Sequence, residues 1–329
     1  MAIPSLCENS WSRSSRFMPV LRSAFIALSR NSGLRSFSES SPIGQRLSSR
    51  FVAGLEIEDA LRATETLNAQ GIAATLDSLG ENVENPDAAR RSAEIYHQLL
   101  DAIRKRGLNA NVSVKLTQMG LELNPDLASG ITAELVGHAV QTDNFVRIDM
   151  EGSALTQATL DIVRGLHAGQ SSTGPHAGHV GVVIQAYLYR SEKDICELIA
   201  DGIRIRLCKG AYQEPAQVAF PSKADVDANF VRLMRILVRS GIYHGIATHD
   251  EAMIEATRQF VRERKIDPTS FEFQMLYGVR RDLQRALVDQ GYRVRVYIPF
   301  GREWYPYFMR RLAERPANVL FLAKNFFKN

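Results

Sequence analysis

The runs HVGVVIQAY (residues 179–187) and IRIRLC (residues 203–208) are apolar and strand-like, and the segment between them is long enough for a helix. Strands connected in this way pair in parallel, because parallel neighbours need a long crossover connection. The same alternation of strand-like and helix-length segments continues on both sides of this pair. Six further strand-like runs lie at 72–77, 111–116, 145–150, 243–247, 271–276 and 293–298.

The number of these repeating units distinguishes between two parallel α/β folds. Eight strand–helix units in roughly 260 residues match the size and count of a (β/α)8 barrel of the TIM type. A doubly wound sheet is the alternative, and when it binds a dinucleotide it has a glycine-rich turn after its first strand. Here that turn is LDSLGENVEN, residues 76–85, with a single glycine, and neither GxGxxG nor GxxxxGK[ST] occurs in the chain. We therefore predict a barrel catalytic domain over residues 51–329.

Positive charge is concentrated in the first fifty residues. They hold seven arginines, fourteen serines and two acidic residues, a net charge of +5, so the rest of the chain carries −1 of the total of +4. A basic stripe for nucleic acid is therefore not expected in the folded part. The composition of 1–50 is typical of an organelle transit peptide, whereas FMPVLRSAFIALSRN at 17–31 has the apolar spacing of an amphipathic helix. We predict an N-terminal arm over 1–50, partly disordered or helical, that packs on the domain or contacts a membrane surface.

Neither the cysteines nor the histidines form a metal-binding pattern. The three cysteines lie far apart without CxxC spacing, and His176 and His179 share a glycine-rich loop with no third ligand nearby. No apolar run reaches the length of a transmembrane helix. We expect no metal site, no disulfide framework and no membrane span.

Charged side chains stand where the predicted strands end, which is where the catalytic residues of parallel barrels lie. Carboxylates are present there, but so are several cations, which oppose a divalent metal ion and favour an anionic ligand. These cations are Lys115, Arg206, Lys209, Arg310 and Arg311.

The cations fall into two groups. Arg206 and Lys209 lie in RIRLCKGAYQEP (204–215), where small residues allow close approach to the backbone, and this suits a phosphate-bearing cofactor. The other group joins Lys115 to the adjacent arginines of YIPFGREWYPYFMRRLAER (297–315), beside aromatic residues. Paired arginines suit a carboxylate and the rings suit a small, partly apolar body. Alternatively, Lys115 and Asp149 form a structural ion pair and the paired arginines are solvated surface charges.

Taken together and in order, the motifs at the strand ends resemble those of the proline dehydrogenases, in particular the monofunctional bacterial type. The resemblance covers residues 50–325, with about one motif for each strand. The motifs are RFVAG, TLDSLGE, VSVKLTQMGL, RIDMEGS, RIRLCKGAYQEP, IATHD, FEFQMLYG and YIPFGREWYPYFMRRLAER.

The resemblance implies a distorted (β/α)8 barrel that binds FAD and oxidises L-proline to Δ1-pyrroline-5-carboxylate by hydride transfer to the flavin. It implies that Arg206 and Asp149 act at the catalytic centre, that Glu81 gates access, and that the C-terminal helix closes the site. The substrate residues it implies are Lys115, Tyr212, Leu276, Tyr297, Tyr307, Arg310 and Arg311. The FAD residues it implies are Gln185, Arg206, Lys209, Gly210, Ala211, Lys223, Thr248, His249 and Glu314.

The resemblance also implies partners and a location. Electrons would pass to a membrane quinone, and a separate pyrroline-5-carboxylate dehydrogenase would take the product towards glutamate. We expect a cytoplasmic protein, with peripheral contact at the inner face of the cell membrane as a further hypothesis. The alternative function is that of a flavin-free barrel enzyme acting on a phosphorylated small molecule.

Overall fold

Eight parallel strands close into a barrel in which each strand pairs with the next along the chain and the last pairs with the first. This computed structural model describes residues 49–80, 83–169, 176–212 and 214–314, with side chains as far as residue 309. The eight predicted strands are confirmed, each within two residues at either end. Their bounds are β1 Ala73–Ser78, β2 Ala110–Val114, β3 Val146–Ile148, β4 Val180–Gln185, β5 Arg204–Cys208, β6 Gly245–Ala247, β7 Glu272–Leu276 and β8 Arg293–Phe300.

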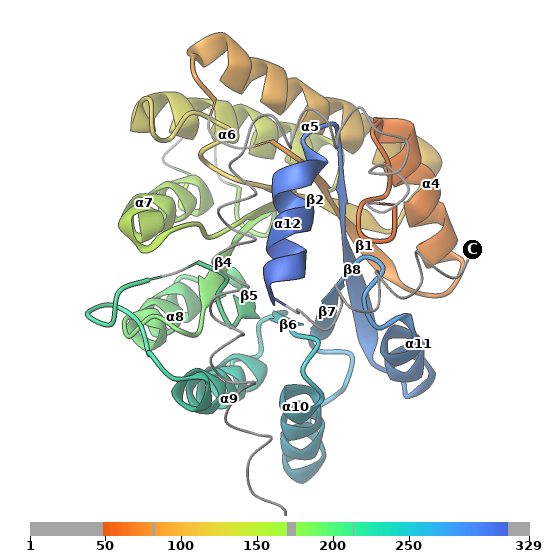
Figure 1. Ribbon diagram of the computed structural model, residues 1–329, viewed down its shortest axis with the longest axis vertical. Helices are drawn as coiled ribbons and strands as arrows, with labels where there is room; N and C mark the ends of the chain where they lie inside the picture. The colour runs from red at the N-terminus through yellow and green to blue at the C-terminus, as the bar shows by residue number, and fades with distance from the viewer. Residues whose placement is uncertain (1–48, 81–82, 170–175, 213, 315–329) are drawn as a thin grey trace, which may run out of the picture. The chain divides into compact units, whose positions relative to one another are not determined.

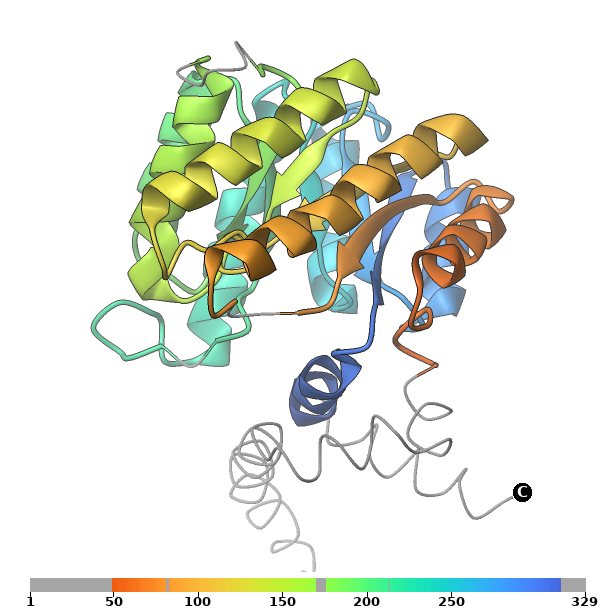
Figure 2. The same ribbon diagram turned by 90° about the horizontal axis from the view of Figure 1, so that it is seen from above.

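Helices surround the barrel (Figure 1). Helix α4 precedes the first strand and packs against both β1 and β8, so it takes the place in the outer ring that a helix after β8 has in a regular barrel. Helices α5 and α6 run side by side (Figure 2). The helices around the barrel are α4 Ile57–Asn68, α5 Pro86–Arg106, α6 Pro125–Gln141, η1 Ser153–Leu155, α7 Thr156–His167, α8 Ser191–Ala200, α9 Lys223–Arg239, α10 Glu251–Arg264 and α11 Arg281–Asp289.

Several of these helices begin at capping residues that the sequence places directly after a strand-end loop. Asn85 accepts a hydrogen bond from the backbone N–H of Ala88 at 2.9 Å, and Pro86 follows it as the first residue of α5. Asn124 caps α6 in the same way. A side-chain acceptor followed by proline satisfies one free N–H and removes another, which fixes where the helix starts.

The strands bury different kinds of side chain on their two faces. Alternate residues such as Val112, Val114 and Ile148 belong to the apolar core that the helices cover. The residues between them point into the barrel, since Arg206 of β5 reaches Ser113 of the non-adjacent β2 at 3.2 Å. TIM barrels usually fill their interior with Val, Ile and Leu. Here much of the interior is polar and charged.

The described residues divide into two compact units. Described residues 53–300 form the barrel, and described residues 49–52 and 301–314 belong to the second unit. In the second unit, helix α12 (Trp304–Glu314) carries Phe308, whose ring centroid lies 6.2 Å from that of Phe51. The predicted arm over 1–50 lies almost wholly outside the described residues, and the closing role of the C-terminal helix stays a prediction.

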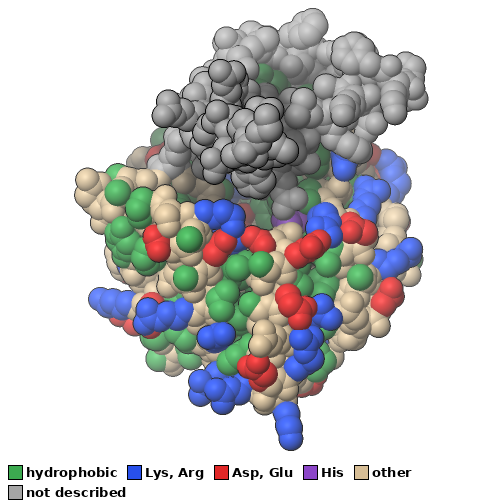
Figure 3. Space-filling model, turned by 60° about the horizontal axis from the view of Figure 1, so that its bottom comes forward, with side chains coloured by type: hydrophobic (Ala, Val, Ile, Leu, Met, Phe, Trp, Pro, Cys, Tyr) green, Lys and Arg blue, Asp and Glu red, His purple; other side chains and the backbone are tan. Residues whose placement is uncertain are grey.

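The distribution of surface charge relates to binding of nucleic acid, and the length and polarity of the helices relate to a membrane span. On the face that Figure 3 shows, acidic and basic side chains are interspersed without a field of one sign. No helix among the described residues is long and apolar enough to cross a membrane.

Candidate active site

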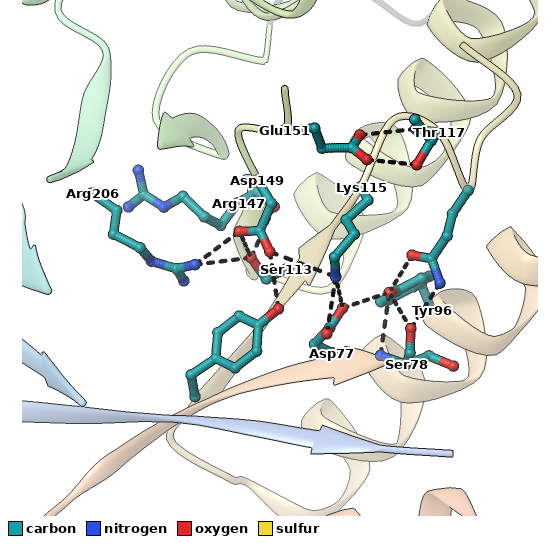
Figure 4. A network of polar contacts seen from close by, with 12 residues as sticks. Asp77, Ser78, Tyr96, Ser113, Lys115, Thr117, Arg147, Asp149, Glu151 and Arg206 are labelled. Atoms are coloured by element: carbon teal, nitrogen blue, oxygen red, sulfur yellow. Dashed lines mark hydrogen bonds and ion pairs between the residues drawn. The ribbon is translucent and has the colours of Figure 1, made fainter. Parts of the chain in front are cut away.

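Asp149, the first residue after β3, joins side chains from several strands at the carboxyl end of the barrel (Figure 4). One carboxylate oxygen accepts hydrogen bonds from Ser113 Oγ at 2.7 Å and from Arg206 Nη1 at 2.9 Å. The other accepts from the Tyr297 hydroxyl at 2.9 Å. These donors come from β2, β5 and β8, so the contacts exist only because the sheet closes. The predicted grouping of Asp149, Arg206 and Tyr297 is present in the structure.

Lys115 follows β2 and contacts two carboxylates. Its Nζ lies 3.1 Å from both oxygens of Asp77 and 3.9 Å from Asp149. Asp77 is fully buried, and the Tyr96 hydroxyl lies 3.3 Å from it. Burial raises the pKa of the Asp77 carboxyl, and the Lys115 charge opposes that shift. Two cations, Lys115 and Arg206, therefore stand against two carboxylates.

Arg206 is held from its other side by Gln274 of β7. The Arg206 Nε donates to Gln274 Oε1 at 2.5 Å, and Gln274 Nε2 donates to Glu272 at 2.5 Å. Gly245 leaves the room for this amide, since a Cβ there would lie 2.4 Å from Gln274 Nε2. The guanidinium also lies over the Tyr297 ring, with Cζ 5.3 Å from the centroid. Arg206 is thus fixed in position by contacts on several sides.

Tyr297 is a hydrogen-bond donor in this cluster. Burial raises the pKa of its hydroxyl well above the ordinary value, and the charges of Asp149 and Asp77 add to the shift. The phenol therefore stays protonated at neutral pH and donates to Asp149.

A second cluster of charges lies beyond β5 and β6. Lys209 pairs with Asp227 and, at 2.7 Å, with Asp250, and Lys223 pairs with the same Asp227 and with Asp250 at 3.5 Å. The lysines hold the pKa of Asp227 below its ordinary value although burial acts to raise it. This cluster contains equal numbers of cations and carboxylates.

Three further polar side chains at this end of the barrel, those of Gln185, His249 and Thr248, make hydrogen bonds with the backbone. Gln185 Nε2 donates to the carbonyl of Glu151 at 2.8 Å. His249 Nε2 accepts a hydrogen bond from the backbone N–H of Leu276 at 2.8 Å, so this nitrogen is the unprotonated one of the neutral imidazole. The Thr248 hydroxyl accepts from the backbone N–H of Asp250 at 3.1 Å.

Comparison with known proteins identifies the family. The sequence profile of the family described as proline dehydrogenase matches residues 60–324. The chain is 42% identical over 310 residues to proline dehydrogenase 1 of Bacillus subtilis (strain 168), covering 94% of this chain and 100% of that one. It is 43% identical over 287 residues to the proline dehydrogenase of Deinococcus radiodurans, covering 86% and 90%. The chain belongs to the proline dehydrogenase family.

Solved structures of two other proteins have the same fold. Proline utilization A from Bdellovibrio bacteriovorus, inactivated by N-propargylglycine, superposes with a TM-score of 0.78 at 23% identity, covering 99% of this chain and 40% of that one. The bifunctional proline utilization A protein superposes with a TM-score of 0.70 at 24% identity, covering 85% and 32%. The barrel fold is therefore confirmed. Membership of the proline dehydrogenase family makes the chain an oxidoreductase of proline catabolism.

The cofactor residues expected of a proline dehydrogenase fit a flavin in part. The hydroxyl of Tyr187 is buried and has no hydrogen-bond partner among the described residues, which is the state expected of a group that faces an absent ligand. Gly210 has φ +115°, but the space of its missing side chain is filled by the Tyr187 ring, 2.5 Å from an added Cβ. Gly210 therefore allows the Tyr187 ring, and not a ligand, to lie close to the backbone at this position. Ala211 and Tyr212 after it are exposed.

Other site residues expected of a proline dehydrogenase lie elsewhere. Glu81 is outside the described residues, and α12 is described at Arg310, Arg311 and Glu314 by its backbone alone. Tyr307 is buried and belongs to the second unit. The grouping of these residues with the barrel residues stays a prediction.

Two residues of the site were not singled out from the sequence as site members. Asp77 pairs with Lys115, and Gln274 fixes Arg206. A buried polar residue inside an apolar strand is the available signal, but its partner cannot be read from one strand. Among the described residues, no group of three or more His, Cys, Asp or Glu side chains could hold a metal ion.

Proposed function

We propose that this chain oxidises L-proline to Δ1-pyrroline-5-carboxylate with FAD as its cofactor, as the first step of proline catabolism. The observation that supports this most directly is the fixed cluster of Asp149, Arg206 and Tyr297 at the carboxyl end of a barrel of the proline dehydrogenase family. Removal of a hydride from a small substrate requires orientation more than a strong acid or base. A cluster whose members are held on several sides provides such orientation.

The charges inside the barrel determine whether a proline carboxylate needs further cations in order to bind. Lys115 and Arg206 are compensated by Asp77 and Asp149, so a substrate carboxylate needs further cations. In our proposal Arg310 and Arg311 of α12 supply these further charges, and Lys115 contacts the carboxylate beside them. The proline ring would lie among the side chains of Tyr212, Leu276, Tyr297 and Tyr307.

We further propose that FAD lies along the strand ends between β4 and β7. When bound, it would supply the hydride acceptor. Arg206 provides a fixed positive charge for an electron-rich ring system, and Lys209 and Lys223 provide donors for phosphate groups, in exchange for their contacts with Asp227 and Asp250. Tyr187, with its buried unpartnered hydroxyl, would join the residues expected to hold the cofactor. These are Gln185, Arg206, Lys209, Gly210, Ala211, Lys223, Thr248, His249 and Glu314.

The proposal also includes an electron acceptor and an enzyme that takes up the product. Electrons would leave to a membrane quinone, which requires at least transient contact with a membrane surface. The product would be taken up by a separate pyrroline-5-carboxylate dehydrogenase.

Anaerobic addition of L-proline to the purified protein tests this function. We expect a visible flavin absorbance band that bleaches on addition of L-proline and returns when a soluble quinone is added. Glycine, which carries the same charges without the ring, is the matched control and should leave the band unchanged. Protein without a flavin band would favour a flavin-free barrel enzyme, and a flavin band that proline does not bleach would contradict the substrate.

A further inference from the structure

A polar cavity opens at the amino end of the barrel, opposite to the candidate active site. Its volume is about 410 Å³, which is in the range of small-molecule sites. Every described residue that lines it belongs to the barrel unit and lies within three residues of the start of a strand. The lining residues are Asn109, Ala110, Asn111, Asp143, Asn144, Phe145, Arg147, Gly178, His179, Arg204, Tyr243, Glu272 and Arg295.

The charges of this cavity do not balance. Of its three arginines, Arg295 is paired with Glu272, with its Nε 2.8 and 3.0 Å from the two carboxylate oxygens. Although burial acts to raise it, Arg295 holds the pKa of Glu272 below its ordinary value, so this carboxylate is ionised. Arg147 and Arg204 have no carboxylate within ion-pair distance among the residues that the structure describes. The other lining acid is Asp143, which is exposed at the rim.

Arg147 is buried, with 4% of its surface exposed, and its contacts leave donors unused. Its Nη1 donates to the carbonyls of Val182 at 3.2 Å and Arg204 at 2.6 Å. Its Nε and Nη2 have no hydrogen-bond partner in the described part of the chain. Burial lowers the pKa of this guanidinium well below its ordinary value, and the nearby charge of Arg206 adds to the shift. The charge of Glu272 opposes this shift from beyond ion-pair distance, so the buried cation has no anion in direct contact among the described residues.

Both unpaired arginines have their guanidinium carbon over aromatic rings. The Cζ atom of Arg147 lies 4.7 Å from the ring centroid of Phe145, and that of Arg204 lies 5.5 Å from the same ring and 6.0 Å from the ring of Tyr243. Stacking uses the face of a guanidinium and leaves its in-plane N–H groups free to donate. Gly181 makes the arrangement possible, since a Cβ there would lie 2.7 Å from Arg147 Nη1 and 2.8 Å from the Phe145 ring.

We propose that this cavity, which we call the amino-end cavity, binds the phosphate group of a small phosphate ester through Arg147 and Arg204. The planar forks of two arginines match the oxygens of a phosphate, and the amides of Asn111 and Asn144 provide neutral donors beside them. The volume leaves room for the organic part of the ester. This site is separate from the proposed proline site and does not depend on that assignment.

The cavity is also connected to the candidate active site. Glu272 accepts from Gln274, which in turn holds Arg206. The hydroxyl of Tyr243, a lining residue, donates to Glu272 at 2.9 Å. Binding of an anion at the amino-end cavity would therefore act on the same chain of hydrogen bonds that positions Arg206.

Calorimetric titration with inorganic phosphate tests the proposal. The full chain is held at saturating FAD, so that any flavin phosphate site is filled, and potassium chloride at matched ionic strength is the reference. We expect saturable binding of phosphate, weakened about tenfold or more in Arg204→Gln, since a hydrogen bond to a charged group is lost. Arg285→Gln removes the same charge from the exposed face of α11 and should bind phosphate like the unmodified chain.

Three outcomes would overturn the site: no phosphate binding beyond the chloride reference, unchanged affinity in Arg204→Gln, or an equal loss in Arg285→Gln. If Arg204→Gln does not fold, Arg204→Lys decides, because it keeps the charge and loses the planar fork. Weaker phosphate binding by Arg204→Lys supports the proposal, and unchanged binding contradicts it. Titration with malonate, a dicarboxylate, tests which kind of anion the cavity binds. If malonate binds more tightly than phosphate, the ligand would be a dicarboxylate and the phosphate assignment would be wrong.

Discussion

The Nη1 atom of Arg206 lies 2.9 Å from Oδ1 of Asp149, and this ion pair joins β5 to the end of β3 inside the barrel. The exposed fractions of the two side chains are 8% and 13%, so the pair is largely withdrawn from water. Breaking a buried pair by removing one charge leaves the other uncompensated. The stability of the barrel interior and the geometry of the candidate site therefore depend on the same contact.

Replacing Asp149 with asparagine tests this dependence. Asp149→Asn keeps an acceptor for Tyr297 and Ser113 but leaves the charge of Arg206 unpaired, so we expect the free energy of unfolding to fall by about 3 kcal/mol. Urea denaturation followed by circular dichroism measures the change. Asp289→Asn, at the exposed end of α11, is the control and should stay within about 0.5 kcal/mol. Equal stability of the two variants would show that the pair contributes nothing.

Gln274 should act through Arg206 rather than on the substrate. Gln274→Leu removes the acceptor of the Arg206 Nε, so the guanidinium can shift, and we expect kcat for proline to fall between about tenfold and a hundredfold. The KM should change much less, because no substrate contact is removed. Steady-state kinetics with a soluble quinone acceptor gives both constants. A rise in KM at constant kcat would instead make Gln274 a binding residue.

The paired arginines of α12 are predicted to bind the substrate carboxylate. Arg310→Met and Arg311→Met should each raise the KM for proline by about tenfold or more, since each removes a hydrogen bond to a charged group. Flavin content, measured from the visible absorbance of the purified variants, should not change. Arg285→Met is the matched control. An unchanged KM in both α12 variants would remove them from the carboxylate site.

His244 should make the protein less stable in acid. Burial, with the nearby charge of Arg147, lowers the pKa of His244 to about 3, and its Nδ1 accepts from the backbone N–H of Ile205 at 3.0 Å. The unfolded chain takes up a proton near its ordinary pKa of 6.5 and the folded chain does not. Stability is therefore fully present above that value and falls, as pH drops from there towards 3, by about 1.4 kcal/mol per pH unit.

Urea denaturation between pH 7 and pH 4 measures this loss. His244→Asn offers a neutral acceptor to Ile205 and should show a shallower dependence on pH. His167→Asn, whose side chain is half-buried on α7, is the control. Equal slopes for His244→Asn and the unmodified chain would contradict the assignment.

Two glycines should respond in opposite ways to the same substitution. Gly181→Ala places a Cβ 2.4 Å from the carbonyl oxygen of Arg204, so the neighbouring strand must shift, and we expect about 1–3 kcal/mol of destabilisation. Gly130→Ala lies in α6 with nothing within 4 Å of the new Cβ and should gain about 1 kcal/mol from helix propensity. Thermal unfolding of the two variants compares them directly. A melting temperature for Gly181→Ala at or above that of the unmodified chain would contradict the close packing.

Much of the architecture could be predicted from the chain alone. Eight apolar runs at helix-length separations require parallel pairing, and eight such units match one closed barrel. The rule that catalytic groups lie at strand ends predicts that Lys115, Asp149 and Tyr297 lie together, and the structure confirms their proximity. These features are local, because strand periodicity and strand-end position can be read along a single segment.

The contacts inside the barrel were decided by the tertiary structure. Asp77 and Lys115 are 38 positions apart, Arg206 and Gln274 are 68 apart, and Asp149 and Tyr297 are 148 apart. Which polar side chain meets which depends on the register around the closed sheet, and a shift of one residue would turn each of them outward. For the same reason the amino-end cavity, with Arg147 and Arg204 stacked on Phe145, has no signature in any one segment. The chain by itself determined which strands form and that they close, and only their closure brought the opposing charges together.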